Sequence, residues 1–392
     1  MSTGACLACG SEDIVRFLRL GDVPIFCNVL RPTAEQARGA ARGALDLGLC
    51  RVCGHAFNVA YDPARVEYGE GYENSLHHSP RFQAYAEALA SDLRARHGLS
   101  GAHIVEIACG QGDFLRLLCQ DERSRGTGYD PSYRGGAVHP RVTIRREYFG
   151  AGPVVGKVDL LCCRHALEHM ADPAGFLTTV RLALGGDWPG TVFFEVPNSL
   201  YSLRDGGVWD FIYEHVSYFC ARSLTACFER AGFGVTRTWE TFTGQFLCIE
   251  ARLDRQAGAP DVSAPVPAGA ELIRLAGSLR AELDALLQHW QVRLRALEGA
   301  SGRAAIWGVG SKGVTFLNLM GAAGANCLAV DINPQKHGLF VPGTAQQVIT
   351  PAELKQAAAG LVVVMNPAYL DEVRGAVRTL GIAADVVGVQ PQ

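Results

Sequence analysis

The sequence lacks an excess of positive charge and lacks any long apolar run. Its 392 residues include 36 Lys and Arg against 39 Asp and Glu, which gives a net charge of −3 and an isoelectric point of about 6.4. Nucleic acids and anionic membranes attract basic patches, so neither is an expected partner. No apolar run reaches the roughly 18 residues of a membrane-spanning helix, and the opening MSTGACLACG lacks the pattern of a signal peptide.

A disulfide framework is not indicated either, although the chain contains 13 cysteines. Without a signal sequence, so many cysteines indicate a reducing compartment, and we expect a cytoplasmic protein. Several of them lie in apolar segments and are expected to be small buried side chains, namely Cys162, Cys163, Cys227 and Cys248. The length and a hydrophobic content of 48% suffice for two or three domains.

Four cysteines near the N-terminus differ from the rest. CLAC and CRVC place Cys6 with Cys9 and Cys50 with Cys53, each pair at C-x-x-C spacing and each followed by glycine. Four thiolates suit a closed tetrahedral Zn²⁺ site, whose role is structural because no coordination position stays open. Such a site would hold together a segment too small for its own core. Two unrelated pairs or a redox pair are the alternatives.

A glycine turn follows a predicted buried strand in GAHIVEIACGQGDFLRLL. Glu106 ends that strand, and Ala108 stands where a first glycine often does. Gly110 and Gly112 form the turn, and Asp130 ends the next predicted strand. The turn lets the backbone approach a ligand closely, and the second acid can accept from ribose hydroxyls. This order resembles the class I S-adenosylmethionine methyltransferases, in which the first acid faces the methionine moiety.

Polar residues follow further predicted strands of the same α/β sheet. In VDLLCCRHALEHMADP and GTVFFEVPN, a buried strand leads into a polar loop. Ligands of an open α/β sheet bind beyond the carboxyl ends of its strands, so we expect these polar groups near the crevice. They are Arg164, His165, Glu168, His169, Glu195 and Asn198. Each could equally be an ordinary loop residue.

A second glycine-rich fold is predicted toward the C-terminus. Residues 254–270 have the composition of a linker, and apolar residues at spacings of three and four then predict a long amphipathic helix. Gly308, Gly310 and Gly313 lie between a predicted strand and helix, and Asp331 ends the next strand. By spacing this is a dinucleotide-binding fingerprint. The chain could be an NAD-dependent dehydrogenase, or a methyltransferase whose second half binds a nucleotide-bearing substrate or is purely structural.

The whole order resembles the bacterial C-methyltransferases of nucleotide-linked deoxysugars. The resemblance is carried by the four cysteines, by EHVSYF at residues 214–219, and by WGVGSKG with Asp331. It implies an α/β protein with a zinc-binding domain over 1–75, an S-adenosylmethionine-binding methyltransferase domain over 76–255 and a Rossmann-like substrate-binding domain over 256–392. It also implies that the second fingerprint shapes the cleft for the nucleotide-sugar and binds no nicotinamide.

The resemblance implies roles for particular residues. His215 is expected to abstract a proton from the carbon next to a carbonyl, with Glu214 assisting, His169 contributing and Tyr72 as a further candidate. The donor is expected at Glu106, Ala108, Gly110, Gly112, Asp130, Arg164 and His165. The substrate is expected at Tyr213, Glu195, Asn198, Gln245, Gly308, Gly310 and Lys312.

The stretch DFIYEHVSYF at residues 210–219 permits this chemistry. A histidine titrates in the right range for a base, and a neighbouring carboxylate would raise its pKa. Adjacent strand residues point to opposite sides, so Glu214 and His215 can both face a substrate only from a loop or helix start. A buried pair that merely holds the loop is the alternative.

The sequence departs from the family pattern at two positions. Ile212 stands where the family has tyrosine, and TGQF, with Gln245, replaces a GGS turn. Methylation of oxygen on a sugar or another small polar metabolite therefore stays open. So does a non-catalytic zinc protein that retains a donor pocket.

Overall fold

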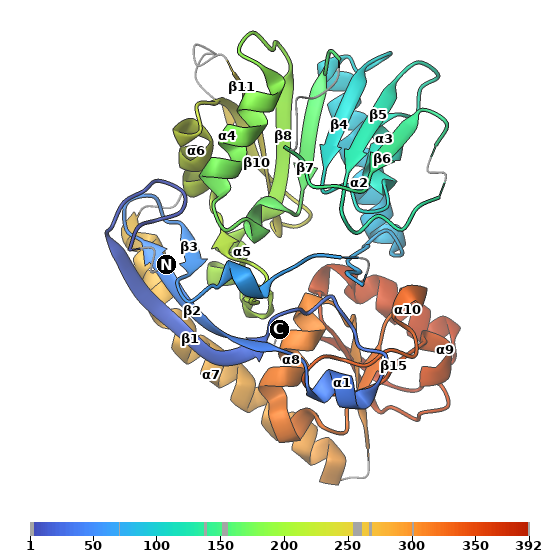
Figure 1. Ribbon diagram of the computed structural model, residues 1–392. Coiled ribbons are helices and arrows are strands. Elements are labelled where there is room, and N and C mark those ends of the chain that lie inside the picture. Colours follow the sequence, from blue (N-terminus) through green and yellow to red (C-terminus); the bar gives the residue numbers. More distant parts are fainter. Residues whose placement is uncertain are drawn as a thin grey trace.

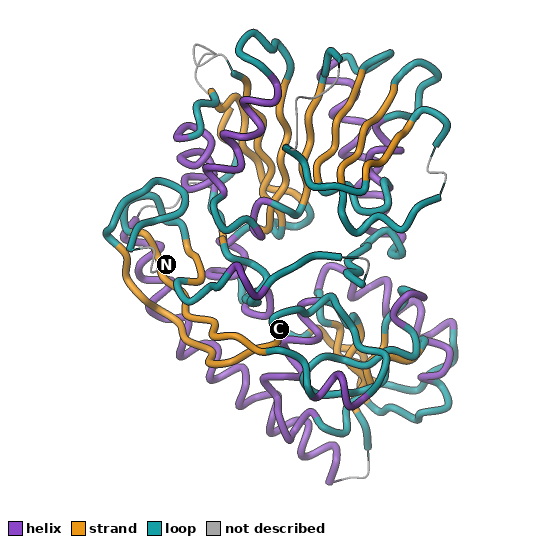
Figure 2. Tube along the Cα trace, viewed as in Figure 1, coloured by secondary structure: helices purple, strands orange, loops and turns teal. Residues whose placement is uncertain are grey.

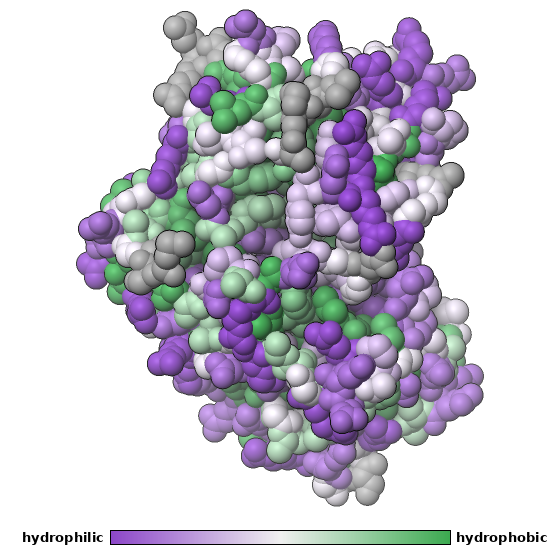
Figure 3. Space-filling view, viewed as in Figure 1, coloured by the Kyte–Doolittle hydropathy of each residue, from purple (hydrophilic) through white to green (hydrophobic). Residues whose placement is uncertain are grey.

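The computed structural model describes residues 4–69, 71–136, 139–150, 156–253, 261–265, 269–299 and 302–390. Figure 1 shows a central domain above a C-terminal domain, with an N-terminal hairpin and a long helix along one side of both. Helices flank the strands in the upper and lower halves (Figure 2). Apolar residues on the visible surface gather near the junction of the two halves (Figure 3). In the described part of the chain, no helix combines the length and apolar character needed to cross a membrane.

The N-terminal domain is a four-stranded antiparallel sheet in the order β1-β2-β3-β9. Its elements are β1 (Ile14–Pro24), α1 (Ala34–Arg38), β2 (Arg42–Cys50), β3 (Ala56–Asn58) and, from the middle of the chain, β9 (Ser217–Tyr218). Ala56 pairs with Tyr218 across the last two strands. The EHVSYF segment is therefore hydrogen-bonded into the N-terminal domain.

The central domain has an eight-stranded sheet in the order β12-β10-β11-β8-β7-β4-β5-β6. Its strands are β4 (His103–Ile107), β5 (Arg125–Tyr129), β6 (Val142–Arg145), β7 (Leu160–Arg164), β8 (Thr191–Pro197), β10 (Gly234–Thr241), β11 (Phe246–Arg252) and β12 (Asp261–Val262). Strands β4 to β8 pair in parallel, and β11 runs antiparallel to both β8 and β10. This order, with β11 reversed, confirms the predicted class I methyltransferase fold.

Helices cover both faces of this sheet because its central strands are apolar on both sides. These helices are α2 (Pro80–His97), α3 (Asp113–Leu118), α4 (Pro173–Leu184) and α6 (Ala221–Arg230), whereas α5 (Ser199–Arg204) packs in the core shared with the N-terminal domain. Ile104 and Leu160 pack in the core that α2 and α3 close, whereas Val105 and Leu161 pack in the core under α4 and α6. The alternation follows the two-residue period of a strand.

The C-terminal domain is a five-stranded parallel sheet in the order β15-β14-β13-β16-β17. Its elements are β13 (Ala304–Trp307), α8 (Ser311–Met320), β14 (Leu328–Val330), β15 (Val348–Ile349), α9 (Pro351–Leu354), β16 (Leu361–Val364), α10 (Leu370–Thr379) and β17 (Asp385–Gly388). The predicted Rossmann-like arrangement of strand, glycine turn and helix is therefore confirmed at β13 and α8.

The predicted amphipathic helix is α7 (Gly269–Gly299), which contacts β1, α5 and α8. Its buried residues include Leu272, Leu279, Leu283 and Trp290, so one stripe faces the protein. The helix thus joins all three domains. Most of the predicted linker lies outside the described residues, and the domain boundaries at 75 and 255 stay predictions.

Candidate active site

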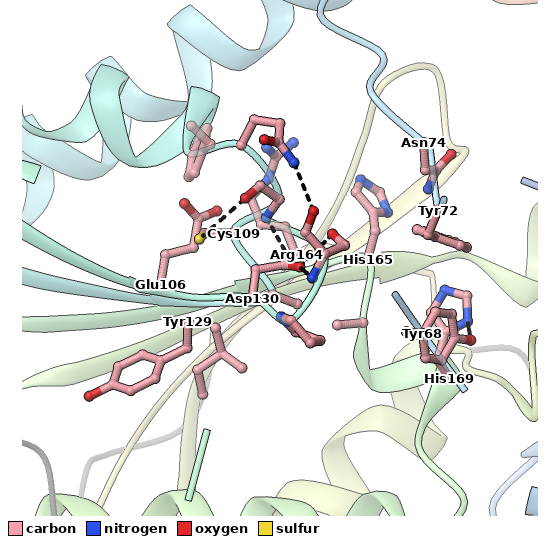
Figure 4. Close-up of a pocket in the computed structure, with 18 of the residues that line it drawn as sticks. Tyr68, Tyr72, Asn74, Glu106, Cys109, Tyr129, Asp130, Arg164, His165 and His169 are labelled. Carbon is pink, nitrogen blue, oxygen red and sulfur yellow. Dashed lines mark hydrogen bonds between the residues drawn. The ribbon is translucent and has the colours of Figure 1, made fainter. Parts of the chain in front are cut away.

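A cavity of about 330 Å³ lies at the carboxyl ends of β4, β5 and β7 (Figure 4). Glu106 lies near the end of β4, Asp130 directly follows β5, and Arg164 ends β7. All three line the cavity, together with Gly110 and His165. Because β4 lies between β5 and β7, the strand order reverses here, and open α/β sheets bind ligands at such a point.

The turn after β4 has the left-handed backbone that its glycines favour. The angle φ is 55° at Ala108, 56° at Gly110 and 84° at Gly112. Ala108 and Gly110 line the cavity, whereas Gly112 precedes the first residue of α3. A Cβ added to Gly110 would meet no described atom within 4 Å, so the cavity wall is open there. The Gly110 amide donates to Asp130 at 2.7 Å, which joins the turn to the end of β5.

Glu106 is a buried carboxyl with an unpartnered oxygen. It is 3% exposed, and its Oε2 has no hydrogen-bond partner among the described residues. Burial raises the pKa of Glu106 to about 8, although the guanidinium of Arg164 opposes the rise. An ammonium group in the cavity would favour the ionised carboxylate. The carboxyl of Glu106 and the guanidinium of Arg164 therefore fit the charged groups at the methionine end of S-adenosylmethionine.

Glu195 lies behind the cavity wall and holds two of its residues. Its Oε1 accepts from Nη2 of Arg164 at 2.8 Å and lies 2.6 Å from Nε2 of His165. Tyr85 donates to its other oxygen. Burial alone would raise the pKa of Glu195, but Arg164 and His165 outweigh it and hold the value at about 2. The guanidinium of Arg164 also lies 4.1 Å from the ring centre of Phe114. Glu195, predicted at the substrate, thus orients donor-site residues.

A second cavity of about 200 Å³ lies between the central and C-terminal domains. Its wall includes the predicted residues His215, Gln245, Gly308, Gly310 and Lys312. His165 and residues 74–76 line both cavities, so the two adjoin. Nζ of Lys312 lies 2.6 Å from Oδ1 of Asp210, which joins the start of α8 to the DFIYEHVSYF segment. The fold therefore brings these five predicted residues into a cavity that adjoins the first.

His169 connects the chain before α2 with the segment that holds His215. Its Nδ1 lies 2.8 Å from the hydroxyl of Tyr68 and 3.0 Å from the carbonyl oxygen of Glu214. Its ring meets that of His215 edge-on, with centroids 4.9 Å apart. Burial lowers the pKa of His169 to about 4, so its imidazole is neutral at pH 7. His169 and the candidate Tyr72 both line the first cavity.

Glu214 and His215 lie in a turn, yet their side chains diverge. His215 lines the second cavity, whereas Glu214 lines neither and accepts from the amide of Cys27 at 3.0 Å. Burial raises the pKa of Glu214 to about 8. The expected rise in the pKa of His215 is wrong: burial, with His169 and Lys312 nearby, places it well below the ordinary value. His215 is thus a neutral imidazole at pH 7.

Two further predicted substrate residues lie outside both cavities. Asn198 is the N-cap of α5, and its Nδ2 donates to Oε1 of Glu240 at 2.7 Å and to the carbonyl of Gly244 at 2.9 Å. Tyr213 is buried in the core shared with the N-terminal domain, and its hydroxyl accepts from the amide of Asp62 at 3.0 Å. Both residues hold neighbouring loops in place.

The two departures from the family pattern lie in different surroundings. Ile212 is buried in the core and lines neither cavity, while the hydroxyl of Tyr218 bonds both its amide and its carbonyl. Gln245 lines the second cavity and pairs with Asn366 of the C-terminal domain. Only the second departure therefore changes a cavity wall.

The sequence pattern did not single out Tyr68 or Glu73, and it named Glu168 only as a polar residue near the expected crevice. Tyr68 bonds His169, and Glu168 lines the second cavity. Glu73 lines the first cavity, where its carboxylate accepts from Arg134 at 2.8 Å and from Asn333 at 3.0 Å. Tyr68 and Glu73 lie in EYGEGYENS, whose density of Tyr and Glu was the available signal.

The four N-terminal cysteines form one cluster, with Sγ atoms all within 4.8 Å of one another. Cys6 and Cys53 lie 3.6 Å apart, as do Cys9 and Cys50. A tetrahedral Zn²⁺ with bonds of about 2.3 Å would separate its sulfurs by about 3.8 Å, so the cluster fits this ion. The cysteines of the described residues are free thiols.

Two family models match the chain. One, described as a methyltransferase domain, matches residues 81–238, and the other, described as a C-methyltransferase C-terminal domain, matches residues 277–382. These are the domains of an S-adenosylmethionine-dependent methyltransferase. A search among curated proteins found no match.

Solved structures of methyltransferases are similar to part of the chain. A candidate O-methyltransferase of Nostoc punctiforme is 17% identical over 44% of this chain and 57% of its own, with a TM-score of 0.37. N,N-8-amino-8-demethyl-D-riboflavin dimethyltransferase of Streptomyces davawensis is 20% identical over 44% of this chain and 55% of its own, with a TM-score of 0.36. Magnesium protoporphyrin IX methyltransferase of Synechocystis, solved with bound SAH, aligns over 44% of this chain and 83% of its own (17%, TM-score 0.33). The chain spans less than two thirds of the first two structures.

The dinucleotide-like fingerprint lies within the matched C-terminal domain. Asp331, the acid of that fingerprint, accepts from the Val309 amide at 2.8 Å and lies 3.2 Å from Nζ of Lys336. Lys336 is 7% exposed and also donates to the Val309 carbonyl. The carboxylate of Asp331 is therefore paired inside the fold with the ammonium group of the buried Lys336.

Proposed function

We propose that the protein transfers a methyl group from S-adenosylmethionine to the carbon next to the carbonyl of a nucleotide-linked keto sugar. The observation that carries this proposal is the junction of the two cavities. His165 and residues 74–76 line both, and a neutral His215 stands in the wall of the second. A carbon acceptor needs such a base beside the donor, because its proton must leave before the carbon can attack.

In the proposed donor site, Glu106 holds the ammonium group and Arg164 the carboxylate of the methionine end. Asp130 accepts from the ribose, and Gly110 leaves room for the ligand beside the turn. When bound, S-adenosylmethionine supplies an electrophilic methyl group on its sulfonium. The four cysteines would hold a structural Zn²⁺ that stabilises the N-terminal domain, whose β3 pairs with the segment after His215.

In the proposed acceptor site, Lys312 and the start of α8 bind the phosphates of the nucleotide, since a helix N-terminus and a cation both favour anions. His215 takes the proton from the carbon, and the electron pair of that C–H bond passes toward the carbonyl oxygen. The pair then returns to form the new C–C bond as the donor's S–CH₃ bond breaks. Glu214 assists indirectly, because its carboxylate bonds the Cys27 amide and so orients the turn that carries His215.

Mass spectrometry of reactions with S-adenosylmethionine and a panel of nucleotide-linked 4-keto sugars tests the proposal. We expect a product heavier by one methyl group and the loss of one α-deuterium from a labelled acceptor. Methyl gain with full retention of deuterium would instead indicate oxygen transfer. Absence of both binding and turnover with every nucleotide-sugar would overturn the substrate class.

The base is tested with a matched pair of variants. His215→Asn should lower turnover by about 10²–10⁴-fold while the affinity for S-adenosylmethionine stays unchanged, because a general base contributes about that factor. His289→Asn, at an exposed position of α7, is the control and should behave as wild type. Unchanged turnover in His215→Asn would remove His215 as the base.

A further inference from the structure

Glu168 is a buried acid in the wall of the proposed acceptor cavity. It lies in the 3₁₀ helix Leu167–His169, which follows the end of β7 after two intervening residues, and is 1% exposed. Glu168 and His215 both line the cavity between the central and C-terminal domains. A carboxyl at such a depth is costly unless a partner or a ligand meets it.

Three groups converge at this point of the wall. Glu168, His169 and His215 each present an oxygen or nitrogen within 4.8 Å of the other two. Oε2 of Glu168 and Nδ1 of His215 have no hydrogen-bond partner among the described residues. His169 is already held, since its Nδ1 contacts the hydroxyl of Tyr68 and the carbonyl of Glu214. Two unpartnered polar atoms thus remain beside the cavity, one on an acid and one on a base.

The protonation states of this pair are complementary. Burial raises the pKa of Glu168 to about 8, with its own backbone amide opposing and Glu195 adding to the rise. Burial lowers the pKa of His215, with His169, Lys312 and His165 adding to the effect. At pH 7 the cavity wall therefore offers a carboxylic acid that can donate and an imidazole that can accept.

We propose that Glu168 is a second catalytic residue of the acceptor site, whose carboxylic acid donates a hydrogen bond to the carbonyl oxygen of the acceptor. This inference rests on the proposed carbon methylation. As His215 takes the α proton, the C–H pair forms a C=C bond and the carbonyl π pair moves onto oxygen. Glu168 keeps its proton and stabilises that oxygen, as preorganised donors do for developing oxyanions. The carbonyl is restored when the new C–C bond forms and the S–CH₃ pair leaves on sulfur.

The assignment gives Glu168 a role that differs from that of a buried structural carboxyl. A structural group would support folding and the donor site, because Glu168 follows β7 closely. A catalytic donor would act on proton removal from the acceptor, even with no methyl to transfer. Exchange of the acceptor's α-deuterium with solvent, measured by NMR with SAH in place of S-adenosylmethionine, isolates that step.

Two variants of the full-length protein separate these roles. Glu168→Gln keeps the size and an N–H donor, and should retain exchange within about tenfold of wild type. Glu168→Leu loses the donor and should lower exchange by about 10²–10³-fold, the cost of one oxyanion donor. Both should bind S-adenosylmethionine with wild-type affinity by calorimetry. Wild-type exchange in Glu168→Leu would overturn the proposal, as would an equal loss of exchange in both variants.

The pH profile provides a readout that survives poor folding of the leucine variant. Wild-type exchange should fall above about pH 8 as Glu168 loses its proton, whereas Glu168→Gln should keep its rate there. The other titratable or charged groups near this position are Tyr68, Tyr72, Cys163, His165, His169, His215, Glu195 and the Lys312–Asp210 pair. If exchange by Glu168→Gln also fell at high pH, the fall would come from the titration of one of these other groups. That result would overturn the role of Glu168.

Two further measurements set the bounds of the inference. Metal analysis of the purified protein should find no divalent ion that is lost with Glu168→Gln, and such an ion would make Glu168 a metal ligand and overturn its role as a donor. If wild type methylates no keto sugar on carbon, the proposed function and this inference both fail. If wild type methylates on carbon and Glu168→Leu does so equally, only the inference fails.

Discussion

Gln245 and Asn366 exchange both of their side-chain hydrogen bonds across the junction of the central and C-terminal domains. Nε2 of Gln245 donates to Oδ1 of Asn366 at 2.9 Å, and Nδ2 of Asn366 donates back to Oε1 of Gln245 at 2.9 Å. Both side chains line the second cavity. The residue that departs from the family's GGS turn thus joins the two walls of the proposed acceptor site.

Removing either amide should weaken acceptor binding, because it breaks both bonds at once. Gln245→Ala and Asn366→Ala should each raise the acceptor KM about tenfold, which corresponds to about 1.4 kcal/mol and so to one or two hydrogen bonds. The double variant should resemble either single one. The exposed Gln288→Ala serves as control. Additive effects of the two changes in this double-mutant cycle would show that the amides act separately.

Gly110 and Gly98 form a matched pair for testing the donor site. Their φ angles are 56° and 59°, and an added Cβ meets no described atom within 4 Å at either. Alanine should cost about 1–2 kcal/mol of stability at both, since both backbones are left-handed. Only Gly110→Ala should also weaken S-adenosylmethionine binding, because only Gly110 lines the first cavity. Calorimetry that finds equal affinities in the two variants would place the donor elsewhere.

Binding of S-adenosylmethionine should release a proton near neutral pH. The pKa of Glu106 is about 8 in the free protein, so its carboxyl is mostly protonated at pH 7. The donor's ammonium favours the carboxylate, and about 0.9 proton should leave per donor bound. The release should diminish between about pH 7 and pH 8, as Glu106 ionises before the donor binds. Calorimetry in buffers of different ionisation enthalpy measures it, and Glu106→Gln should abolish it.

The cysteine cluster should carry about one Zn²⁺ per chain. Cys6→Ser should remove most of this zinc and lower the midpoint of thermal unfolding, because metal binding contributes to folding free energy. Cys327→Ser changes a buried cysteine of the C-terminal domain and should leave the zinc content intact. Elemental analysis of both variants provides the comparison. Equal zinc in the two would mean that the cluster does not hold the ion.

Local spacing in the sequence was enough to predict the turn and the two acids that line the first cavity. Glu106, the glycine turn and Asp130 lie within one strand–helix–strand unit, so their relative positions follow from chain geometry. The same holds for the two C-x-x-C pairs and for the glycine turn between β13 and α8. These features each depend on a few neighbouring residues and on the regular hydrogen bonding of strands and helices.

Other features depend on contacts between distant parts of the chain. Glu214 bonds the amide of Cys27, 187 positions away, and therefore turns from its neighbour His215. Burial then lowers the pKa of His215 and raises that of Glu168, and these changes set the protonation states of the two side chains. No local pattern carries this information, because desolvation is produced by the packing of separate domains around the site.

The sequence by itself thus determined the fold class, the glycine turn after β4 and the cysteine pairs. Each of these follows from short stretches of neighbouring residues and from the backbone geometry that they favour. Only the tertiary structure decided which side chains meet at the junction. It placed Tyr213 and Asn198 outside both cavities and brought Glu168 and Gln245 into the wall of the second. The reason is physical: which face of a turn is buried depends on the elements that pack against it.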